Sequence, residues 1–317
     1  NGRVFIVNCF TGETEYSTNA HDDFVDTVCV GMTTKKLLIG ITGAFDNKII
    51  VWDLRNHTQL KILGPGGEET VDGQNIERVG HTGHIHEIRL SPTGGWFASC
   101  SGDRSIKLWD TETFKLLFTL REPFGVNCID ISTDENFILS GSRGVVRIWD
   151  LTTRKEVMTK YAHEDKVDTV AFAPDSRTFA SSSGPSVHVY NRQNDNKGKS
   201  KYKLMHQLQN PSGKNISDLR FVNDGKSIQA LAKYDTALCW DLSDKAGELT
   251  NEAAVAAQKL VYLNIEDNIH VRPRNPTETG FTAEGPIRVA ALGPIKSNGE
   301  RTGIVIEGHK PHIITES

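Results

Sequence analysis

The chain has 317 residues, of which 37% are hydrophobic and 24% are charged, and its formal net charge is -4. This composition is typical of a globular protein, and the charge argues against a general attraction for nucleic acid or anionic membranes. No apolar run approaches the roughly 18 residues that a membrane-spanning helix needs. Five cysteines, an odd number, favour a reducing compartment, so we expect an intracellular location, cytoplasmic or nuclear.

Short alternating runs of apolar and polar residues, separated by turns rich in Pro, Asp and Gly, predict β-strands along most of the chain. A single strand is expected at 3–8. Beyond residue 243 the pattern weakens: the alanine-rich stretch 250–259 is compatible with a short helix, and strands are expected at 260–271 and 287–292. The clear strands form groups at 24–63, 85–119, 126–160, 167–207 and 216–240.

A phrase that ends in Trp-Asp recurs within these groups. The cleanest unit begins at Gly80-His81 and ends at Trp109-Asp110. Repetition at about 40–45 residues, with a Gly-His beginning and a Trp-Asp ending, indicates the blades of a β-propeller. The copies lie at 49–54, 106–111, 146–151 and 237–242, with a weaker one at 187–192 that has Tyr-Asn instead.

These units resemble the repeats of the WD-repeat family. The resemblance implies an all-β fold, a closed WD-repeat β-propeller with seven four-stranded blades that forms a single domain over residues 1–317. Five blades are expected from the groups above. A degenerate blade is expected within 243–308, and residues 1–16 and 309–317 are expected to share the closing blade. A fragment of a longer protein is also compatible with this pattern.

The resemblance further implies a polar network inside the best blades. It joins a His of the Gly-His turn, a Ser or Thr of the second strand, a Trp of the third strand and an Asp of the turn before it. Buried indole and imidazole groups need such partners. The units that end at Trp149 and Tyr190 lack part of the set. The network is expected at His81, Ser99 or Ser101, Asp103 and Trp109, and at His21, Thr42, Asp46 and Trp52.

A binding surface is expected where the first strands begin. In this family that end of the blades surrounds the mouth of the central channel, on the top face. Acidic loop residues such as Glu68 and Glu69 are expected on the same face, so the surface suits a basic peptide or protein segment, although ordinary solvated loops would give the same pattern. The candidate residues are Asp26, Phe45, His86, Asn127, Arg143, Asp168, Ser217 and Tyr234.

Other chemistry is weakly indicated. The spacing of His81, His84 and His86 suits a metal, but no Cys or carboxylate is expected beside them, so no metal, cofactor or catalytic residue is predicted. Alternating lysines at 197–203 indicate a solvated loop more than a nucleic-acid contact. We therefore expect a non-enzymatic scaffold for protein partners. The alternatives are a larger protein's sensor domain and, because 52–55 resembles a Trp-Asp-x-Arg motif, a substrate receptor of a cullin-type ubiquitin ligase.

Overall fold

The computed structural model describes residues 2–8, 14–65, 68–71, 75–194, 200–232, 237–243, 261–263, 287–292 and 302–307. This part of the chain is built from strands and turns and holds no helix that is long and apolar enough to cross a membrane. It divides into two compact units, which are described separately below: residues 1–126 with 266–317, and residues 127–265.

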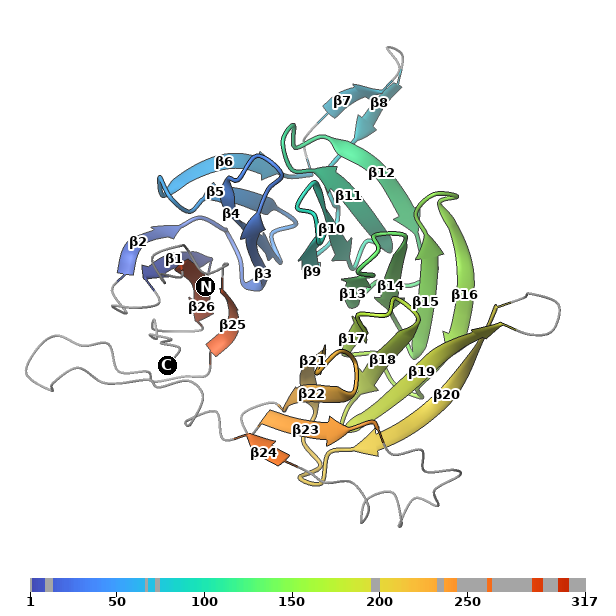
Figure 1. The fold of residues 1–317 in the computed structure, drawn as a ribbon. Helices are drawn as coiled ribbons and strands as arrows, with labels where there is room; N and C mark the ends of the chain where they lie inside the picture. Colours follow the sequence, from blue (N-terminus) through green and yellow to red (C-terminus); the bar gives the residue numbers. More distant parts are fainter. Residues whose placement is uncertain are drawn as a thin grey trace, which may run out of the picture. The chain divides into compact units, whose positions relative to one another are not determined.

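The first unit contains two blades made of four consecutive antiparallel strands (Figure 1). In both, the chain runs from one edge strand of the sheet to the other without a crossover, as adjacent short strands joined by tight turns require. The first blade is β3 (Val25–Met32), β4 (Leu38–Ala44), β5 (Ile49–Asp53) and β6 (Thr58–Leu63). The second is β9 (Ile85–Leu90), β10 (Trp96–Ser101), β11 (Ser105–Asp110) and β12 (Leu116–Arg121).

The second unit contains three blades of the same kind. They are β13 (Cys128–Ile131), β14 (Phe137–Gly141), β15 (Val145–Asp150) and β16 (Lys155–Tyr161); β17 (Thr169–Phe172), β18 (Thr178–Ser183), β19 (Ser186–Asn194) and β20 (Ser200–Gln209); and β21 (Ile216–Val222), β22 (Ser227–Ala232), β23 (Ala237–Asp241) and β24 (Val261–Leu263).

The two ends of the chain share one further sheet in the first unit. Its strands are β1 (Arg3–Asn8), β2 (Thr14–Asn19), β25 (Ile287–Leu292) and β26 (Thr302–Glu307), in the order β2-β1-β26-β25. Within 243–308 the described strands join sheets that begin earlier in the chain: β24 is the fourth strand of the sheet of β21–β23, and β25 and β26 lie in the sheet of β1 and β2. Most of 243–308 lies outside the described residues, so the blade expected there stays a prediction. Residues 309–317 lie outside the described residues.

The insertion between β6 and β9 forms a hairpin, β7 (Glu68–Val71) and β8 (Asn75–Arg78), and is not simply a loop. The hairpin pairs only with itself among the described strands (Figure 1). An isolated two-stranded ribbon has little stability of its own in water. In its strand pairing it is therefore an appendage of the first unit.

The Asp of the Trp-Asp phrase organises the turn that follows the third strand. Asp53 accepts hydrogen bonds from the backbone N–H groups of Arg55 and Asn56, and Asp110 accepts one from Thr113 at 2.7 Å. A carboxylate that caps backbone N–H groups in this way replaces lost ladder bonds at a tight turn. The same turn contains a non-glycine residue with positive φ at His57, Phe114 and Arg154.

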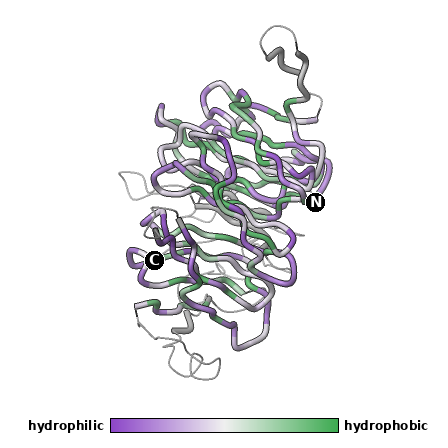
Figure 2. The backbone as a smooth tube through the Cα atoms, turned by 90° about the vertical axis from the view of Figure 1, so that its right-hand side faces the viewer, coloured by the Kyte–Doolittle hydropathy of each residue, from purple (hydrophilic) through white to green (hydrophobic). Residues whose placement is uncertain are grey.

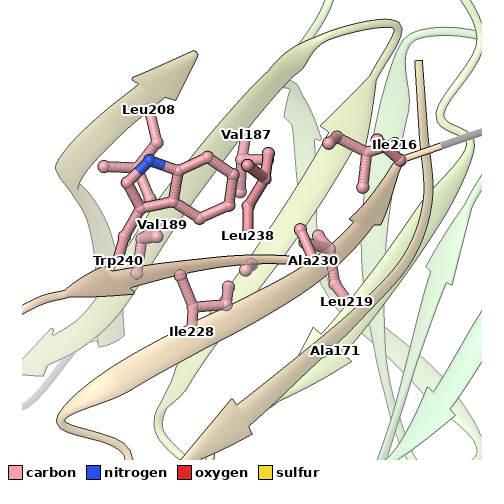
Figure 3. Close-up of a cluster of buried hydrophobic side chains, with 12 residues drawn as sticks. Ala171, Val187, Val189, Leu208, Ile216, Leu219, Ile228, Ala230, Leu238 and Trp240 are labelled. Carbon is pink, nitrogen blue, oxygen red and sulfur yellow. The ribbon is translucent and has the colours of Figure 1, made fainter. Parts of the chain in front are cut away.

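The aromatic residue of the phrase fills the core between neighbouring blades. Trp109 is fully buried and packs with Phe97 of its own blade and with Ile39, Ile41 and Val51 of the preceding blade. Trp240 likewise packs on Val187, Val189 and Leu208 (Figure 3). Figure 2 shows hydrophobic stretches along the strands and hydrophilic turns between them. Each blade thus depends on its neighbour to bury its apolar face, as in other repeat proteins.

Candidate functional site

The blade of β9–β12 contains the four-residue polar network. His81 contacts Asp103 through Nδ1 at 2.8 Å and Ser99 through Nε2 at 2.8 Å, and the Trp109 indole donates to Ser99 Oγ at 2.9 Å. Ser105 Oγ also donates to Asp103 at 2.6 Å. Because the indole donates to Ser99, the serine hydroxyl is available to donate to His81 Nε2, and Nδ1–H then faces the carboxylate. Every buried polar group in the network therefore has a partner.

The electrostatics agree with a neutral imidazole beside an ionised carboxylate. Burial lowers the pKa of His81, although Asp103 opposes the shift. Burial works against ionisation of Asp103, but hydrogen bonds from His81 and Ser105 hold the pKa of this carboxyl well below its usual range. The Ser–His–Asp set resembles a hydrolase triad in composition only. Ser99 is 0% exposed and its oxygen accepts from Trp109, so no substrate can reach it.

The blade of β3–β6 repeats this network. His21 contacts Asp46 at 3.0 Å and Thr42 at 2.9 Å, and the Trp52 indole donates to Thr42 at 3.1 Å. Burial again lowers the pKa of His21 despite the adjacent Asp46. A threonine does here what a serine does in the next blade, because both offer one hydroxyl that accepts from the indole and donates to the imidazole.

The blade of β13–β16, which lacks the His and the Asp, uses an arginine. The Trp149 indole donates to Ser140 at 3.0 Å, as in the complete networks. Arg147 is 5% exposed, donates to Ser142 at 3.1 Å and lies 3.3 Å from a carboxylate oxygen of Glu156. A buried guanidinium needs such a carboxylate, because removing its charge from water is otherwise very costly. This blade therefore has a buried ion pair in addition to its packing and its indole hydrogen bond.

The blade of β17–β20 keeps the histidine and lacks the carboxylate. His163 contacts Ser181 through Nε2 at 2.9 Å, and its ring stacks on His188 at a centroid distance of 4.3 Å. Burial, with repulsion from His188, lowers the pKa of His163 to about 4. Burial lowers the pKa of His188 as well. Both rings are consequently neutral at physiological pH, and a carboxylate partner is not needed.

The blade of β21–β24 leaves its indole unsatisfied. Trp240 Nε1 is buried and has no hydrogen-bond partner among the residues that the structure describes. In strand register, the position of Ser99 and Ser140 is occupied by Ala230, which is 1% exposed (Figure 3). The alanine methyl group cannot accept from the indole. The loss of one hydroxyl explains why this N–H is orphaned.

Three of the predicted rim residues come together in the first unit. The carboxylate of Asp26 lies 3.3 Å from Nδ1 of His86, and Phe45 meets the same imidazole edge-on at 6.1 Å. A fourth residue, His84, stacks on Phe45 with a centroid distance of 4.5 Å and an interplanar angle of 17°. We refer to Asp26, Phe45, His84 and His86 as the rim cluster.

The backbone around the rim cluster holds it at the ends of two blades. The Phe45 N–H donates to the Phe24 carbonyl at 2.8 Å, and the Gly102 N–H donates to the His84 carbonyl at 3.0 Å. Gly102 also leaves the imidazole of His86 uncovered, since a Cβ there would lie 3.6 Å from its Nε2. Phe24 is 47% exposed beside this cluster. The result is a surface with one carboxylate, two imidazoles and accessible aromatic rings.

Sequence reasoning did not assign His84 and Phe24 to this surface. His84 was considered only as a metal ligand, although its position next to Gly83 in the turn before β9 could have placed it at the rim. The exposure of Phe24 has no signal in the sequence, because an aromatic residue before a strand is more often buried. Among the described residues, no group of three His, Cys, Asp or Glu side chains is arranged to hold a metal ion.

The rim residues of the second unit mostly bind their own chain. Asp168 accepts from the Gly184 N–H at 2.8 Å and pairs with Lys166 at 3.2 Å, and its side chain is only 15% exposed. Asn127 donates to the Val167 carbonyl at 3.3 Å, while Ser217 donates to a main-chain carbonyl of β22 at 3.0 Å. Arg143 is exposed. The predicted Tyr234 lies outside the described residues.

Comparison with known protein families shows which residues match a repeat family. The family described as "WD domain, G-beta repeat" matches residues 74–110, 114–150 and 154–191. The last two matches begin at the outer strand of one blade and end at the third strand of the next. A single sequence repeat therefore contributes to two sheets that follow each other along the chain.

Individual relatives carry the same repeats. The chain is 27% identical over 139 residues to the small ribosomal subunit protein RACK1 of Caenorhabditis elegans, which covers 44% of this chain and 38% of that protein. It is 27% identical over 156 residues to the eukaryotic translation initiation factor 3 subunit I of Drosophila willistoni, 44% of each. It is 34% identical over 101 residues to the coatomer subunit beta'-1 of Arabidopsis thaliana, 30% of this chain and 11% of that protein.

Each match spans less than half of the relative concerned, and the relatives are named as subunits of three different assemblies. What they share with this chain is the repeat itself. The matched repeats confirm the WD repeats expected from the Trp-Asp phrases at 106–111, 146–151 and 187–192. The chain carries WD40 repeats over residues 74–110, 114–150 and 154–191, and its four-stranded antiparallel sheets have the form of WD40 β-propeller blades.

Proposed function

We propose that this protein is a non-enzymatic interaction scaffold, and that the rim cluster holds a segment of a partner protein that carries Lys or Arg. The observation that supports this most directly is the placement of Asp26. Its carboxylate is 40% exposed and lies beside a Phe45–His84 stack that also faces the rim. WD-repeat proteins generally serve as platforms for partners, and function in such folds resides in local sites.

The chemistry of the rim cluster suits a cation. An ammonium or guanidinium group is attracted both by a carboxylate and by the face of an aromatic ring. His86 occupies one oxygen of Asp26 at 3.3 Å, a long contact that an incoming cation can replace. Aromatic residues at the centre of an interface usually supply most of the binding energy, so Phe45 is the expected anchor.

The other predicted rim residues receive smaller roles. For the second unit taken by itself, Asn127, Arg143 and Ser217 are proposed to contact a partner protein. Asp168 is proposed to hold the turn before β19, since Gly184 and Lys166 already occupy it. The acidic residues of the β7–β8 hairpin, including Glu68 and Glu69, are proposed to attract a basic partner at long range, an effect that salt would screen.

The proposal is tested with a fluorescein-labelled peptide, Gly-Ala-Arg-Ala-Lys-Ala-Gly, and with the same peptide carrying Glu in place of Arg and Lys. We expect Asp26→Asn to weaken binding of the basic peptide about tenfold, the loss of roughly one favourable charge contact. Phe45→Ala is expected to weaken it further. The control is Glu112→Gln, which removes a paired carboxylate of similar exposure in the β11–β12 turn. Equal binding by Asp26→Asn and the wild type would contradict the proposal.

We further propose the architecture expected from the sequence, a closed propeller of seven blades that makes one domain and works inside the cell, in the cytoplasm or nucleus. The sheet shared by β1, β2, β25 and β26 supports closure, because pairing of the ends leaves fewer strand edges exposed. Small-angle scattering combined with a crystal structure of the chain would test it. An open ring, or a separately folded domain beyond residue 243, would contradict it.

A second candidate is a substrate receptor of a cullin-type ubiquitin ligase. The observation in its favour is that Arg55, in Trp52-Asp53-Leu54-Arg55, has an exposed side chain while its backbone N–H is held by Asp53. Copurification with a ligase adaptor, lost in Arg55→Ala, would support this role. A third alternative, the sensor domain of a larger protein, stays a prediction.

A further inference from the structure

The outermost strand of the β17–β20 blade has features of a second binding surface, separate from the rim cluster. β20 has ten residues and is the longest of the described strands. It stands at the end of its sheet and pairs only with β19 in the part of the chain that the structure describes (Figure 1). Its outer edge therefore presents backbone N–H and C=O groups that can extend the sheet by one strand.

The extended part of β20 is firmly held on one face. Tyr202 packs on Phe179 at a centroid distance of 5.8 Å, and Arg192 of the partner strand β19 lies 5.5 Å from the ring centre of Phe137. Burial raises the pKa of the Tyr202 hydroxyl, consistent with this packing. The hairpin is thus anchored to the blade next to it, and its edge is presented in a fixed position.

The opposite face of β20 carries positive charge. Lys201 and Lys203 flank Tyr202, so strand alternation places both side chains on the face away from it. Both are exposed, and neither ammonium takes part in an ion pair among the described residues. The next two residues, Leu204 and Met205, are 40% and 46% exposed at a β-bulge. Charge and apolar surface therefore lie together on one strand edge.

We propose that the edge of β20 docks an extended acidic segment of a partner protein by strand addition. Main-chain pairing would provide affinity and the lysines would provide selectivity, as in other cases of strand addition. Residues two apart in a strand lie about 7 Å from each other, so the lysines match Asp or Glu at alternate positions of the partner. A second copy of this chain does not fit, since two β20 edges would bring lysines against lysines.

The test uses a fluorescein-labelled peptide, acetyl-Glu-Val-Glu-Val-Glu-Val-Glu-amide, and the matching peptide with Lys in place of Glu. Anisotropy titrations compare the wild type with the Lys201→Glu, Lys203→Glu double variant. We expect the acidic peptide to bind the wild type and to lose about tenfold in affinity with the variant, which should gain affinity for the lysine peptide. The Lys201→Gln, Lys203→Gln variant should bind both peptides weakly. Lys61→Glu, Lys155→Glu, on the exposed outer strands β6 and β16, is the matched control.

Hydrogen exchange then locates the peptide. Protection of the β20 amides by the acidic peptide, absent in the charge-reversed variant, is the expected result. The proposal is overturned if protection falls on other strands, if charge reversal leaves the affinity for the acidic peptide unchanged, or if a labelled ten-residue oligothymidylate binds the same edge more tightly than the peptide. Dimerisation of the wild type that the glutamate variant abolishes would also overturn it.

Discussion

The orphaned indole of Trp240 gives the sharpest test of how these blades are stabilised. We expect Ala230→Ser to raise the free energy of unfolding, because the new hydroxyl stands where Ser99 and Ser140 accept from an indole in other blades. The hydroxyl proton can point to the Leu238 carbonyl, which stands at the register position of the Lys107 carbonyl, 3.5 Å from Ser99 Oγ in the other blade.

The magnitude follows from the cost of a buried donor without a partner. Such a group costs about 1–3 kcal/mol, and part of that gain is offset by burying a hydroxyl at a position only 1% exposed. The expected net stabilisation is about 1 kcal/mol, or roughly a fivefold change in the unfolding equilibrium. The reverse change in another blade, Ser140→Ala, should destabilise by about 1–3 kcal/mol because it orphans Trp149.

The assay is urea unfolding followed by tryptophan fluorescence, with the ¹⁵N–¹H signal of the Trp240 indole as a local reporter. Ala230→Cys is the control, since a thiol has a similar size and is a weak acceptor. The reasoning fails if Ala230→Ser is no more stable than Ala230→Cys, or if the indole signal does not shift towards those of the hydrogen-bonded tryptophans. A destabilised serine variant would show that the site has no room for the oxygen.

Three further predictions concern the other blades. Trp109→Ala should lower the unfolding free energy by about 3–5 kcal/mol and His81→Ala by about 1–3 kcal/mol in denaturant titrations, and an unchanged midpoint for His81→Ala would contradict the network. The pKa of His163 is about 4 in the folded protein against an ordinary value of 6.5, so as the pH falls the unfolded chain binds this proton first. The contribution of the neutral ring to the free energy of unfolding is therefore complete above about pH 6.5 and falls as the pH approaches 4. His163→Gln should flatten this pH dependence in thermal melts measured across the same range. Asp168→Ala should lower the free energy of unfolding by about 1–2 kcal/mol, since the Gly184 N–H loses a charged acceptor. A variant that melts like the wild type would show that this hydrogen bond does not stabilise the turn.

The strands were predictable from the sequence wherever local pattern and pairing agree. The copy of the phrase at 49–54, within the strand group 24–63, is observed as β5 at Ile49–Asp53, because alternation and the turn at Asp46 are both local signals. The ends were harder. β26 pairs with β1, and nothing in the apolar run 303–306 says which distant strand it joins. The β7–β8 hairpin does have a local signal, Asp72-Gly73, which is typical of hairpin turns.

For the rim residues, the sequence indicates where they lie in a blade but not whether their side chains are free to bind a partner. Asp26 and Asp168 occupy equivalent places by alignment, yet Asp26 keeps 40% of its side chain exposed and Asp168 keeps 15%. The difference comes from Lys166 and the Gly184 N–H, which reach Asp168 only once the turns have folded. Whether a carboxylate is free depends on the donors that fold against it. No pattern in a single sequence predicts which donors these are.

The pairing of β1 with β26 also constrains how the protein is made. Phe5 and Val305 are register partners although they are about three hundred residues apart. During synthesis at about 5–20 residues per second, the first strands would wait roughly 15–60 s for their partner to leave the ribosome. Val4 and Ile6, fully buried in the finished sheet, stay without that partner for the whole interval. During synthesis β1 is therefore an unpaired, apolar edge strand. A chaperone can bind this edge, or a strand of a neighbouring nascent chain can pair with it, before β26 is made.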